Sequence, residues 1–346
     1  MEIGIDSFAA ILPSPKTGIL PSATDRMAGL LEEVEVADRV GLEVCGIGEH
    51  HRAEFLDSAP AMILAAAAAR TKTIRLTSAV TVLSAADHVR VFQQFATLDL
   101  IAGGRAEIVV GRGSFGEAYP LFGLQTSDYD ALFAEKLDLF LKLRETTHPV
   151  WKGRYRPALQ GQGVFPRPHQ KLLPVWLGVG GSPESFIRAG TLGLPLMVAI
   201  IGGTFDRFRP LVDLYRETGL KSGFSPEQLK VGVHAMGFVG ETTKEAKDSF
   251  YPGWAHLVGT IGRERGWSAP TRQQFEATCG PGGAYLIGDP ATVASKMLAA
   301  SDALGGLSRI TFQMSSASLE TAAMKRSIEL LGTEVGPIIR AAQPKR

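Results

Sequence analysis

An arginine between two glycines, in the run Gly111-Arg112-Gly113, is the first feature of this chain whose residue types could bind a ligand. Glycine lets a backbone come close to a ligand, and a guanidinium offers a fixed, forked positive charge that suits a phosphate or a carboxylate. Arg112 therefore predicts an anion site.

A second glycine-rich stretch could hold the same anion. Residues 178–185 read Gly-Val-Gly-Gly-Ser-Pro-Glu-Ser and open a predicted helix, in which Ser182 suits the N-cap and Pro183 the first helical position. Free backbone N–H groups at a helix start favour an anion, and the hydroxyls of Ser182 and Ser185 add donors. Many such turns are glycine-rich for backbone reasons alone. The prediction of one shared phosphate site therefore rests on the pairing with Arg112.

Two adjacent histidines, His50 and His51, follow Glu49 directly after another predicted strand. Successive side chains of a strand point to opposite faces, so both cannot face the same ligand. A histidine at this position could donate a proton near neutral pH, or it could form a structural pair with a carboxylate. The remaining histidines show neither HxH nor HExxH spacing, so no metal site is predicted.

Small side chains stand in a row at Ala79-Val80-Thr81 on a third predicted strand. They could form a flat platform for an aromatic ring, or they could be ordinary packing inside a sheet. A further pair, Asp99 and Arg105, brackets the turn at Gly103-Gly104 and predicts a buried ion pair.

The elements that position these residues follow a strand–helix–strand order within residues 75–113. The segment 76–83 reads as a strand, 89–101 has the apolar spacing of a helix, and 106–110 reads as a second buried strand. Such a unit predicts two parallel strands joined by a helix. Arg112 then lies where the second strand ends, at the edge where parallel α/β folds bind ligands.

The same alternation continues along the whole chain. Further strands are predicted at 2–8, 44–48, 175–179, 196–200, 230–239 and 307–314, and further helices at 25–41, 59–70, 127–145, 183–192, 206–218, 243–260, 289–304 and 319–340. Eight alternating strands without a linker predict one (β/α)8 TIM barrel domain over residues 1–346, with a doubly wound open sheet as the alternative. A hairpin insertion is expected at 151–167 and a long lid loop at 262–285.

The composition excludes several classes of protein. The 36 basic and 35 acidic residues nearly balance, which gives no reason to expect nucleic acid or an anionic membrane as a partner. Two cysteines far apart, Cys45 and Cys279, form no disulfide framework, and the reducing cytoplasm fits this usage. The N-terminal residues do not read as a signal peptide, and the most apolar run, 61–69, is too short to cross a membrane.

Taken in order, these pieces resemble the bacterial luciferase-like monooxygenases, which are flavin-dependent barrel enzymes. The resemblance covers nearly the whole chain. It is carried by the motifs Gly48-Glu49-His50-His51, Thr77 to Leu83, Thr97-Leu98-Asp99 with Gly103-Gly104-Arg105, Gly111-Arg112-Gly113, Gly180 to Ser185 with Leu192 to Pro195, Tyr285 to Pro290, and Ser327 to Leu331.

The resemblance implies a role for each matching residue. Ala79-Val80 matches the place where family members often have a non-proline cis peptide beneath the isoalloxazine ring, and His50 matches the histidine near the reacting face of the flavin, with His51 beside it. The residues implied to hold the flavin phosphate are Arg112, Gly180, Gly181, Ser182 and Ser185. The chain departs from the family at His88, where proline is usual, and at Gly181, where the luciferases carry an acidic residue.

The resemblance also implies an activity. It is that of a monooxygenase in which reduced FMN and O2 oxygenate a small organic substrate, with the reduced flavin supplied by a separate NAD(P)H-dependent reductase. The alternatives are a deazaflavin (F420)-dependent oxidoreductase on the same scaffold and a flavin-binding protein without turnover. Family members usually dimerise through the helices at 59–70 and 89–101, so a homodimer is expected.

Overall fold

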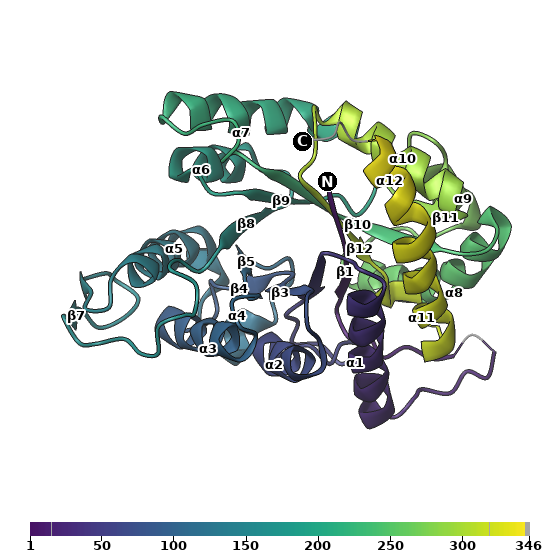
Figure 1. Cartoon of the computed structure of the whole chain (residues 1–346). Helices are drawn as coiled ribbons and strands as arrows, with labels where there is room; N and C mark the ends of the chain where they lie inside the picture. The colour runs from purple at the N-terminus through teal and green to yellow at the C-terminus, as the bar shows by residue number, and fades with distance from the viewer. Residues whose placement is uncertain (15, 318, 343–346) are drawn as a thin grey trace.

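A nearly closed parallel barrel wrapped by helices forms the body of the molecule (Figure 1), which confirms the predicted (β/α)8 TIM barrel. The computed structural model describes residues 1–14, 16–317 and 319–342. Within these residues the strands follow one another around the barrel in the order β3 (Arg75–Ser78), β2 (Val44–Ile47), β1 (Glu2–Ser7), β12 (Arg309–Gln313), β10 (Val231–Val239), β9 (Leu196–Ala199), β8 (Val175–Val179), β5 (Ile108–Gly111) and β4 (Thr81–Val82).

The third predicted strand is broken in two, and this break is where the barrel closes. The expectation of one continuous strand over 76–83 is wrong, because a cis peptide bond between Ala79 and Val80 separates β3 from β4. β3 pairs with β2, and its Leu76 also exchanges backbone hydrogen bonds with Arg105 and Glu107 before β5. β4 then pairs with β5. Counted as one interrupted strand, β3 and β4 bring the barrel to the eight strands predicted.

Helices cover the outside of the barrel, with short segments at its ends. Their bounds are α1 (Ala23–Arg39), α2 (Pro60–Arg70), α3 (His88–Ile101), α4 (Ala118–Leu121), η1 (Thr126–Asp128), α5 (Tyr129–Glu145), α6 (Pro183–Leu192), η2 (Asp206–Phe208), α7 (Arg209–Lys221), α8 (Thr243–Glu264), α9 (Arg272–Cys279), α10 (Pro290–Ala303), η3 (Ser315–Ala317), α11 (Thr321–Leu330), the π-helix η4 (Leu331–Val335) and α12 (Gly336–Ala342). No helix in the described ranges is long and apolar enough to cross a membrane.

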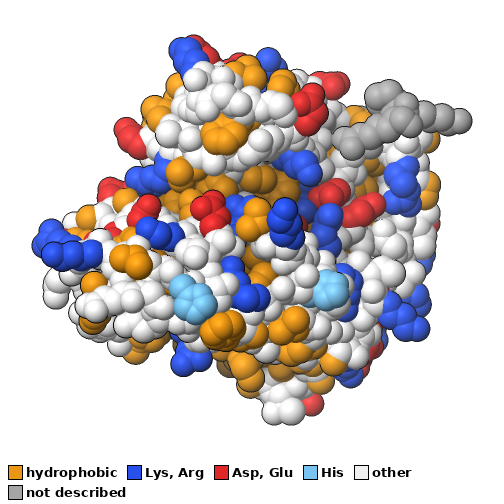
Figure 2. All heavy atoms as spheres, turned by 60° about the vertical axis from the view of Figure 1, so that its left-hand side comes forward, with side chains coloured by type: hydrophobic (Ala, Val, Ile, Leu, Met, Phe, Trp, Pro, Cys, Tyr) orange, Lys and Arg blue, Asp and Glu red, His pale blue; other side chains and the backbone are white. Residues whose placement is uncertain are grey.

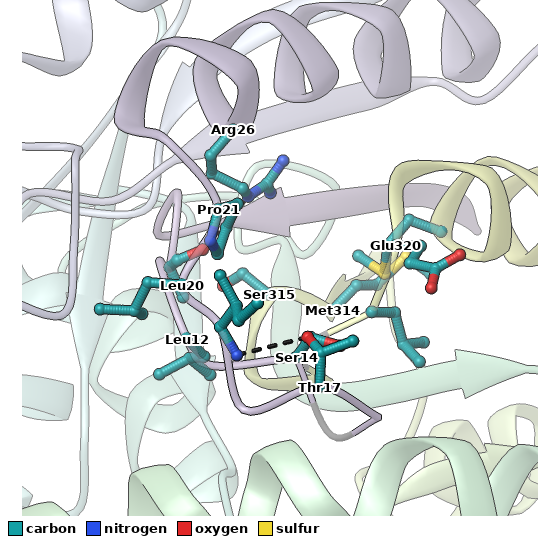
Figure 3. Close-up of a pocket in the computed structure, with 13 residues that line it drawn as sticks. Leu12, Ser14, Thr17, Leu20, Pro21, Arg26, Met314, Ser315 and Glu320 are labelled. Atoms are coloured by element: carbon teal, nitrogen blue, oxygen red, sulfur yellow. Dashed lines mark hydrogen bonds between the residues drawn. The ribbon is translucent and has the colours of Figure 1, made fainter.

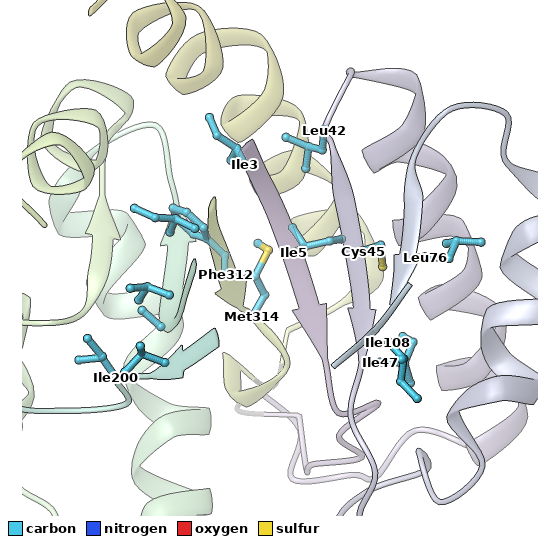
Figure 4. Close-up of a cluster of buried hydrophobic side chains, with 14 of the residues drawn as sticks. Ile3, Ile5, Leu42, Cys45, Ile47, Leu76, Ile108, Ile200, Phe312 and Met314 are labelled. Atoms are coloured by element: carbon cyan, nitrogen blue, oxygen red, sulfur yellow. The ribbon is translucent and has the colours of Figure 1, made fainter. Parts of the chain in front are cut away.

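Alternation along each strand divides the core in two. On β1 and β2 the side chains of Ile3, Ile5, Cys45 and Ile47 belong to the large cluster packed under the helices (Figure 4). The residues between them, such as Gly4 and Asp6, therefore point into the barrel. At the N-terminal end of the strands the interior is ionic. Arg309 is 1% exposed, pairs with Glu107 and Glu2, and lies 4.3 Å above the ring of Trp176.

Several predicted segments differ in detail. β6 (Val150–Trp151) and β7 (Leu159–Gln160) form an antiparallel pair inside the expected hairpin. The segment 262–285 is not one long loop, because α8 runs to Glu264 and a capping box at Thr271 starts α9. β11 (Leu286–Gly288), which follows this segment, adds a strand beside β10 that the sequence pattern did not show.

The expected ion pair between Asp99 and Arg105 does not form. Asp99 accepts hydrogen bonds from the backbone of Ala106 and from both the backbone and the side chain of Gln170. Arg105 instead donates to backbone carbonyls, among them that of Ile74. Each charged side chain instead satisfies backbone groups of neighbouring segments: Arg105 bonds carbonyls at the end of α2 and before β3, and Asp99 accepts backbone N–H groups of Ala106 and Gln170.

Candidate functional site

His50, directly after β2, pairs with a carboxylate that the sequence reading did not single out. Its Nδ1 lies 2.8 Å from Oδ2 of Asp57, and its backbone N–H donates to Oδ1 of the same side chain at 3.1 Å. Both side chains are buried, and burial is the main cause that raises the pKa of Asp57. An ionised carboxylate only accepts hydrogen bonds, so Nδ1 carries hydrogen and Nε2 is left for other partners.

Aromatic side chains surround the His50 ring. The ring centroid lies 4.4 Å from that of Phe8, 4.6 Å from that of Phe55 and 5.3 Å from that of Phe115. These rings come from the segments that follow β1, β2 and β5, at the C-terminal edge of the barrel. These rings and the burial of His50 keep its side chain largely out of water.

A second histidine–carboxylate pair lies on the other side of Phe8. Nδ1 of His234, on β10, is 2.5 Å from Oδ2 of Asp6, on β1, and both residues are at least nine-tenths buried. The ring of His234 stacks on Phe8 at 5.7 Å. Sequence patterns alone do not single out His234, which belongs to neither an HxH nor an HExxH motif. The signal was available, since both residues fall on predicted strands, but pairing positions 228 residues apart requires the register of the barrel.

His51 points to a different partner from His50, as alternation requires. Its Nε2 lies 3.4 Å from Oε1 of Glu49, and the hydrogen bond to this carboxylate is the main cause that raises the pKa of His51. The other oxygen of Glu49 accepts the backbone N–H of Val82 at 2.9 Å. Glu49 therefore ties His51 to the chain just after the Ala79–Val80 peptide.

The side chain of Val80 projects into the barrel between two glycines. A β-carbon placed on Gly111 would lie 2.7 Å from Cγ2 of Val80, and one placed on Gly178 would lie 2.6 Å from its Cγ1. Val80 also packs on Val109, Trp176 and Met197, which fill the barrel below it. Val80, in the row Ala79-Val80-Thr81, thus packs inside the barrel, which was one of the two alternatives for this row. This packing leaves open the other alternative, a platform for an aromatic ring.

Arg112, Ser182 and Ser185 come together where the sequence predicted a shared anion site. One guanidinium nitrogen of Arg112, Nη2, donates to Oγ of Ser182 at 3.0 Å and to Oγ of Ser185 at 3.2 Å. The two hydroxyls are 2.8 Å apart, which is hydrogen-bond distance. The other nitrogen pairs with Asp130, and the guanidinium lies 4.9 Å above the ring of Tyr129.

The start of α6 leaves room and unpaired donors beside this cluster. Ser182 occupies the N-cap but makes no side-chain capping hydrogen bond. β-carbons on Gly180 and Gly181 would meet open space, because nothing lies within 4 Å of either. Arg188, on the same helix, has a buried Nη1 with no hydrogen-bond partner in the described part of the chain, and its pKa is lowered first by burial and then by the charge of Arg112. Positive charge and N–H donors are therefore in excess here.

The rim above His50 is held by ion pairs around one arginine. Arg52 pairs with Glu54, with Glu117 before α4 and with Glu264 at the end of α8. Arg265 donates to the carbonyl of Ser114 at 2.9 Å and lies 4.8 Å above the Phe115 ring. The start of the predicted lid segment thus reaches the mouth, although part of that segment is helical. Figure 2 shows one face hollowed at its centre, with hydrophobic side chains inside and charged side chains around them.

Comparison with known proteins relates this geometry to one family. The sequence profile of the luciferase-like monooxygenase family matches residues 1–306. The chain is 28% identical to 4-hydroxyprotoasukamycin monooxygenase of Streptomyces nodosus subsp. asukaensis, over 96% of this chain and 91% of that protein. It is 29% identical to protein y4wF of Sinorhizobium fredii, over 63% of this chain but only 64% of that protein's length.

Two solved structures share the fold. The oxygenating constituent of 3,6-diketocamphane monooxygenase of Pseudomonas putida, in complex with FMN, superposes with a TM-score of 0.80 at 20% identity and full coverage of both chains. The coenzyme F420-dependent tetrahydromethanopterin reductase of Methanopyrus kandleri gives 0.73 at 20% identity, over 97% of this chain and 98% of that one. At this identity the two structures support the barrel fold and nothing narrower.

Proposed function

Because the chain belongs to the luciferase-like monooxygenase family, we propose that it is a monooxygenase that uses reduced FMN and O2 to oxygenate a small organic substrate. Relatives named as monooxygenases support the reaction class, and an FMN complex of a structural relative supports the cofactor. Reduced flavin, when bound, would supply the chemistry that activates O2. The protein would supply binding, orientation and protons.

The anion cluster at the start of α6 carries the proposal. Arg112, Ser182 and Ser185 present one forked cation and two hydroxyls, and Nη1 of the neighbouring Arg188 bonds to none of the described residues. A phosphate monoester supplies the missing negative charge, because helix N-termini and guanidinium groups both favour phosphate oxygens. The backbone at Gly180 and Gly181 is open on its outer side, so a phosphate could approach closely there.

The residues at the barrel mouth fit the ring of the same cofactor. Ala79 and Val80 lie at the break between β3 and β4, and the side chain of Val80 packs on the residues that fill the barrel. His50, at the end of the adjacent strand β2, would be the proton donor near the ring. Asp57 fixes its tautomer, and Phe8, Phe55 and Phe115 keep water away from it. His51 would act only indirectly, through Glu49.

A separate reductase would supply the reduced flavin. The GxGxxG run at residues 111–116 follows β5 but leads into the four-residue helix α4 rather than into the long helix of a dinucleotide-binding βαβ unit, so we propose a two-component system in which an NAD(P)H-dependent partner reduces FMN.

Titrating the purified protein with three ligands tests the proposal. We expect FMN to bind more tightly than riboflavin, because riboflavin lacks the phosphate, and more tightly than F420. Addition of NADH and a flavin reductase should then give substrate-dependent oxygen uptake across a panel of cyclic ketones, aldehydes and sulfonates. Preferential F420 binding, with substrate-dependent F420 reduction in the absence of oxygen, would instead establish the deazaflavin reaction. FMN binding without oxidation of any substrate would leave a flavin-binding protein.

We also propose that the protein is a homodimer through α2 and α3. A shallow groove between these helices is lined by Met62, Ile101 and Phe165, whose side chains are 70%, 52% and 58% exposed. Exposed apolar groups that gather in one place commonly mark an interaction surface. Figure 2 shows hydrophobic side chains gathered along the lower part of the molecule, where α2 and α3 lie in Figure 1.

A further inference from the structure

A cavity of about 330 Å³ lies apart from the Arg112 cluster, between the loop after β1 and the segment from β12 to α11 (Figure 3). Small-molecule sites in proteins usually measure about 300–1,000 Å³, so this cavity is large enough for a ligand. The segment that follows β1 runs from the His50 site to this cavity. Phe8 packs against His50, whereas Ala10 and Leu12, a few residues further along the same segment, line the cavity.

The lining is mainly aliphatic. It contains no aromatic side chain, in contrast to the rings around His50. The residues are Ala10, Leu12, Ser14, Thr17, Ile19, Leu20, Pro21, Arg26, Met314, Ser315, Leu319, Glu320 and Met324. Two of the lining residues are methionines, Met314 and Met324. Their unbranched and flexible side chains adapt to the shape of an apolar ligand.

The charged groups of the lining already have partners. Arg26 donates from Nε to the carbonyl of Ala10 at 3.1 Å and from Nη1 to Glu33 at 2.9 Å. Glu320 lies at the rim and pairs with Lys16. A charged ligand would have to leave water without gaining a free counter-ion, which is unfavourable.

The hydroxyls of the lining are also engaged. Oγ of Ser315 accepts the backbone N–H of Phe8 at 3.0 Å and the side-chain amide of Gln313 at 2.7 Å. Oγ1 of Thr17 accepts the backbone N–H of Ile19, and Oγ of Ser14 accepts that of Lys16. The hydroxyls can still donate one hydrogen bond each, which suits a ligand with a single neutral oxygen.

We propose that this cavity binds an uncharged aliphatic chain ending in one neutral polar group. The apolar lining and the paired charges disfavour an anion, and the absence of rings among the described lining residues gives an aromatic ligand nothing to stack on. The inference does not depend on the flavin reaction, because the residues that carry it lie outside the Arg112 cluster.

Methionine methyl signals give a local test. The protein is labelled with ¹³C-methyl methionine, Met314 and Met324 are assigned with M314L and M324L, and the flavin-free protein is titrated with 1-octanol and, separately, with octanoate. We expect 1-octanol to shift both signals and to leave that of Met62, which is exposed on α2, unchanged. Octanoate, with the same chain length and a charge, should bind at least tenfold more weakly.

A matched pair of variants places the binding site. Leu20 lines the cavity and is 55% exposed, whereas Leu220 on α7 is 52% exposed and lies outside it. L20W should weaken 1-octanol binding by covering the cavity, and L220W should not. The proposal is wrong if 1-octanol leaves the Met314 and Met324 signals unmoved, if octanoate binds equally well, or if both tryptophan variants behave alike.

Discussion

Val80 and Gly178 share one space inside the barrel: a β-carbon on Gly178 would lie 2.6 Å from Cγ1 of Val80. Gly111 stands in the same relation on the adjoining strand β5. From the sequence, Gly111 and Gly178 belong to glycine-rich runs expected to let a ligand approach. The structure shows that both positions must also be glycine to leave room for the side chain of Val80. The interrupted strand, the two glycines and the barrel filling form one packing unit beneath the proposed flavin ring.

This packing predicts the effect of G178A. The added methyl group must displace Val80, and overpacking of a core typically costs about 1–3 kcal/mol. We expect urea denaturation to show a loss of this size and FMN affinity to fall with it, because Val80 supports the proposed ring site. G202A is the control, since a β-carbon there meets open space. Equal effects of the two substitutions would contradict the packing argument.

Substitutions in the anion cluster should change FMN affinity in opposite directions. R112A removes charge-assisted hydrogen bonds worth about 1.5–3 kcal/mol each, so we expect FMN affinity to fall by roughly ten- to a hundredfold. D130N removes the carboxylate that pairs with Arg112, so FMN affinity should rise by up to about fivefold, as expected for an exposed ion pair. Quenching of flavin fluorescence measures both.

Riboflavin serves as the matched ligand for these variants. It has the same ring without the phosphate, so R112A should leave riboflavin affinity unchanged. If R112A weakened FMN and riboflavin equally, Arg112 would not be the phosphate ligand.

The His50–Asp57 pair predicts a separation of turnover from binding. Loss of a general acid or base commonly slows a reaction by about 10²–10⁴-fold, so H50A should lower kcat by this order while FMN affinity is kept. D57N should lower kcat less, because it disturbs only the tautomer and orientation of His50. Stopped-flow and steady-state oxygen uptake measure kcat, and unchanged turnover of H50A would remove its catalytic role.

Sequence reasoning reached the barrel, the anion cluster and the position of His50, because each depends on local signals. The runs Gly111-Arg112-Gly113 and Gly180 to Pro183 each follow a strand directly, so the strand itself places them at the mouth of the barrel. The partners of these residues were harder to find. Asp57 is only seven residues from His50, but it lies in an irregular segment whose path has no periodicity. The Asp6–His234 and Arg112–Asp130 pairs depend on packing between elements, which a pattern along one chain does not reveal.

The proposed dimer predicts that a charged substitution on the exposed face of α3 separates the two copies. I101K introduces a charge into the groove lined by Met62 and Phe165, and burying it against a second copy would be costly. We expect light scattering to give twice the chain mass of 37.0 kDa for the natural protein and a single chain mass for I101K. L220K, at a comparably exposed leucine on α7, should remain dimeric. A natural protein that is monomeric at all concentrations would refute the proposal.

His88 predicts a pH dependence of stability. Its ring is 1% exposed, neither ring nitrogen has a hydrogen-bond partner among the described residues, and burial is the main cause that lowers its pKa to about 4. Because the folded pKa lies below the unfolded value of about 6.5, the unfolded chain binds the proton first as the pH falls. The stability associated with the neutral ring is therefore complete above pH 6.5 and is lost between about pH 6.5 and 4, by about 3 kcal/mol.

H88F keeps a ring at this position, beside Trp151, but cannot titrate. Urea denaturation at a series of pH values should show that the natural protein loses about 3 kcal/mol more stability than H88F on going from pH 7 to pH 4. H88P offers a second variant, because proline is favoured in the first turn of a helix and the side chain of Asp87 still caps α3 by accepting from the backbone of Arg90. Parallel curves of stability against pH for the natural protein and both variants would contradict the prediction. They would show that the pKa of His88 is the same in the folded and the unfolded chain.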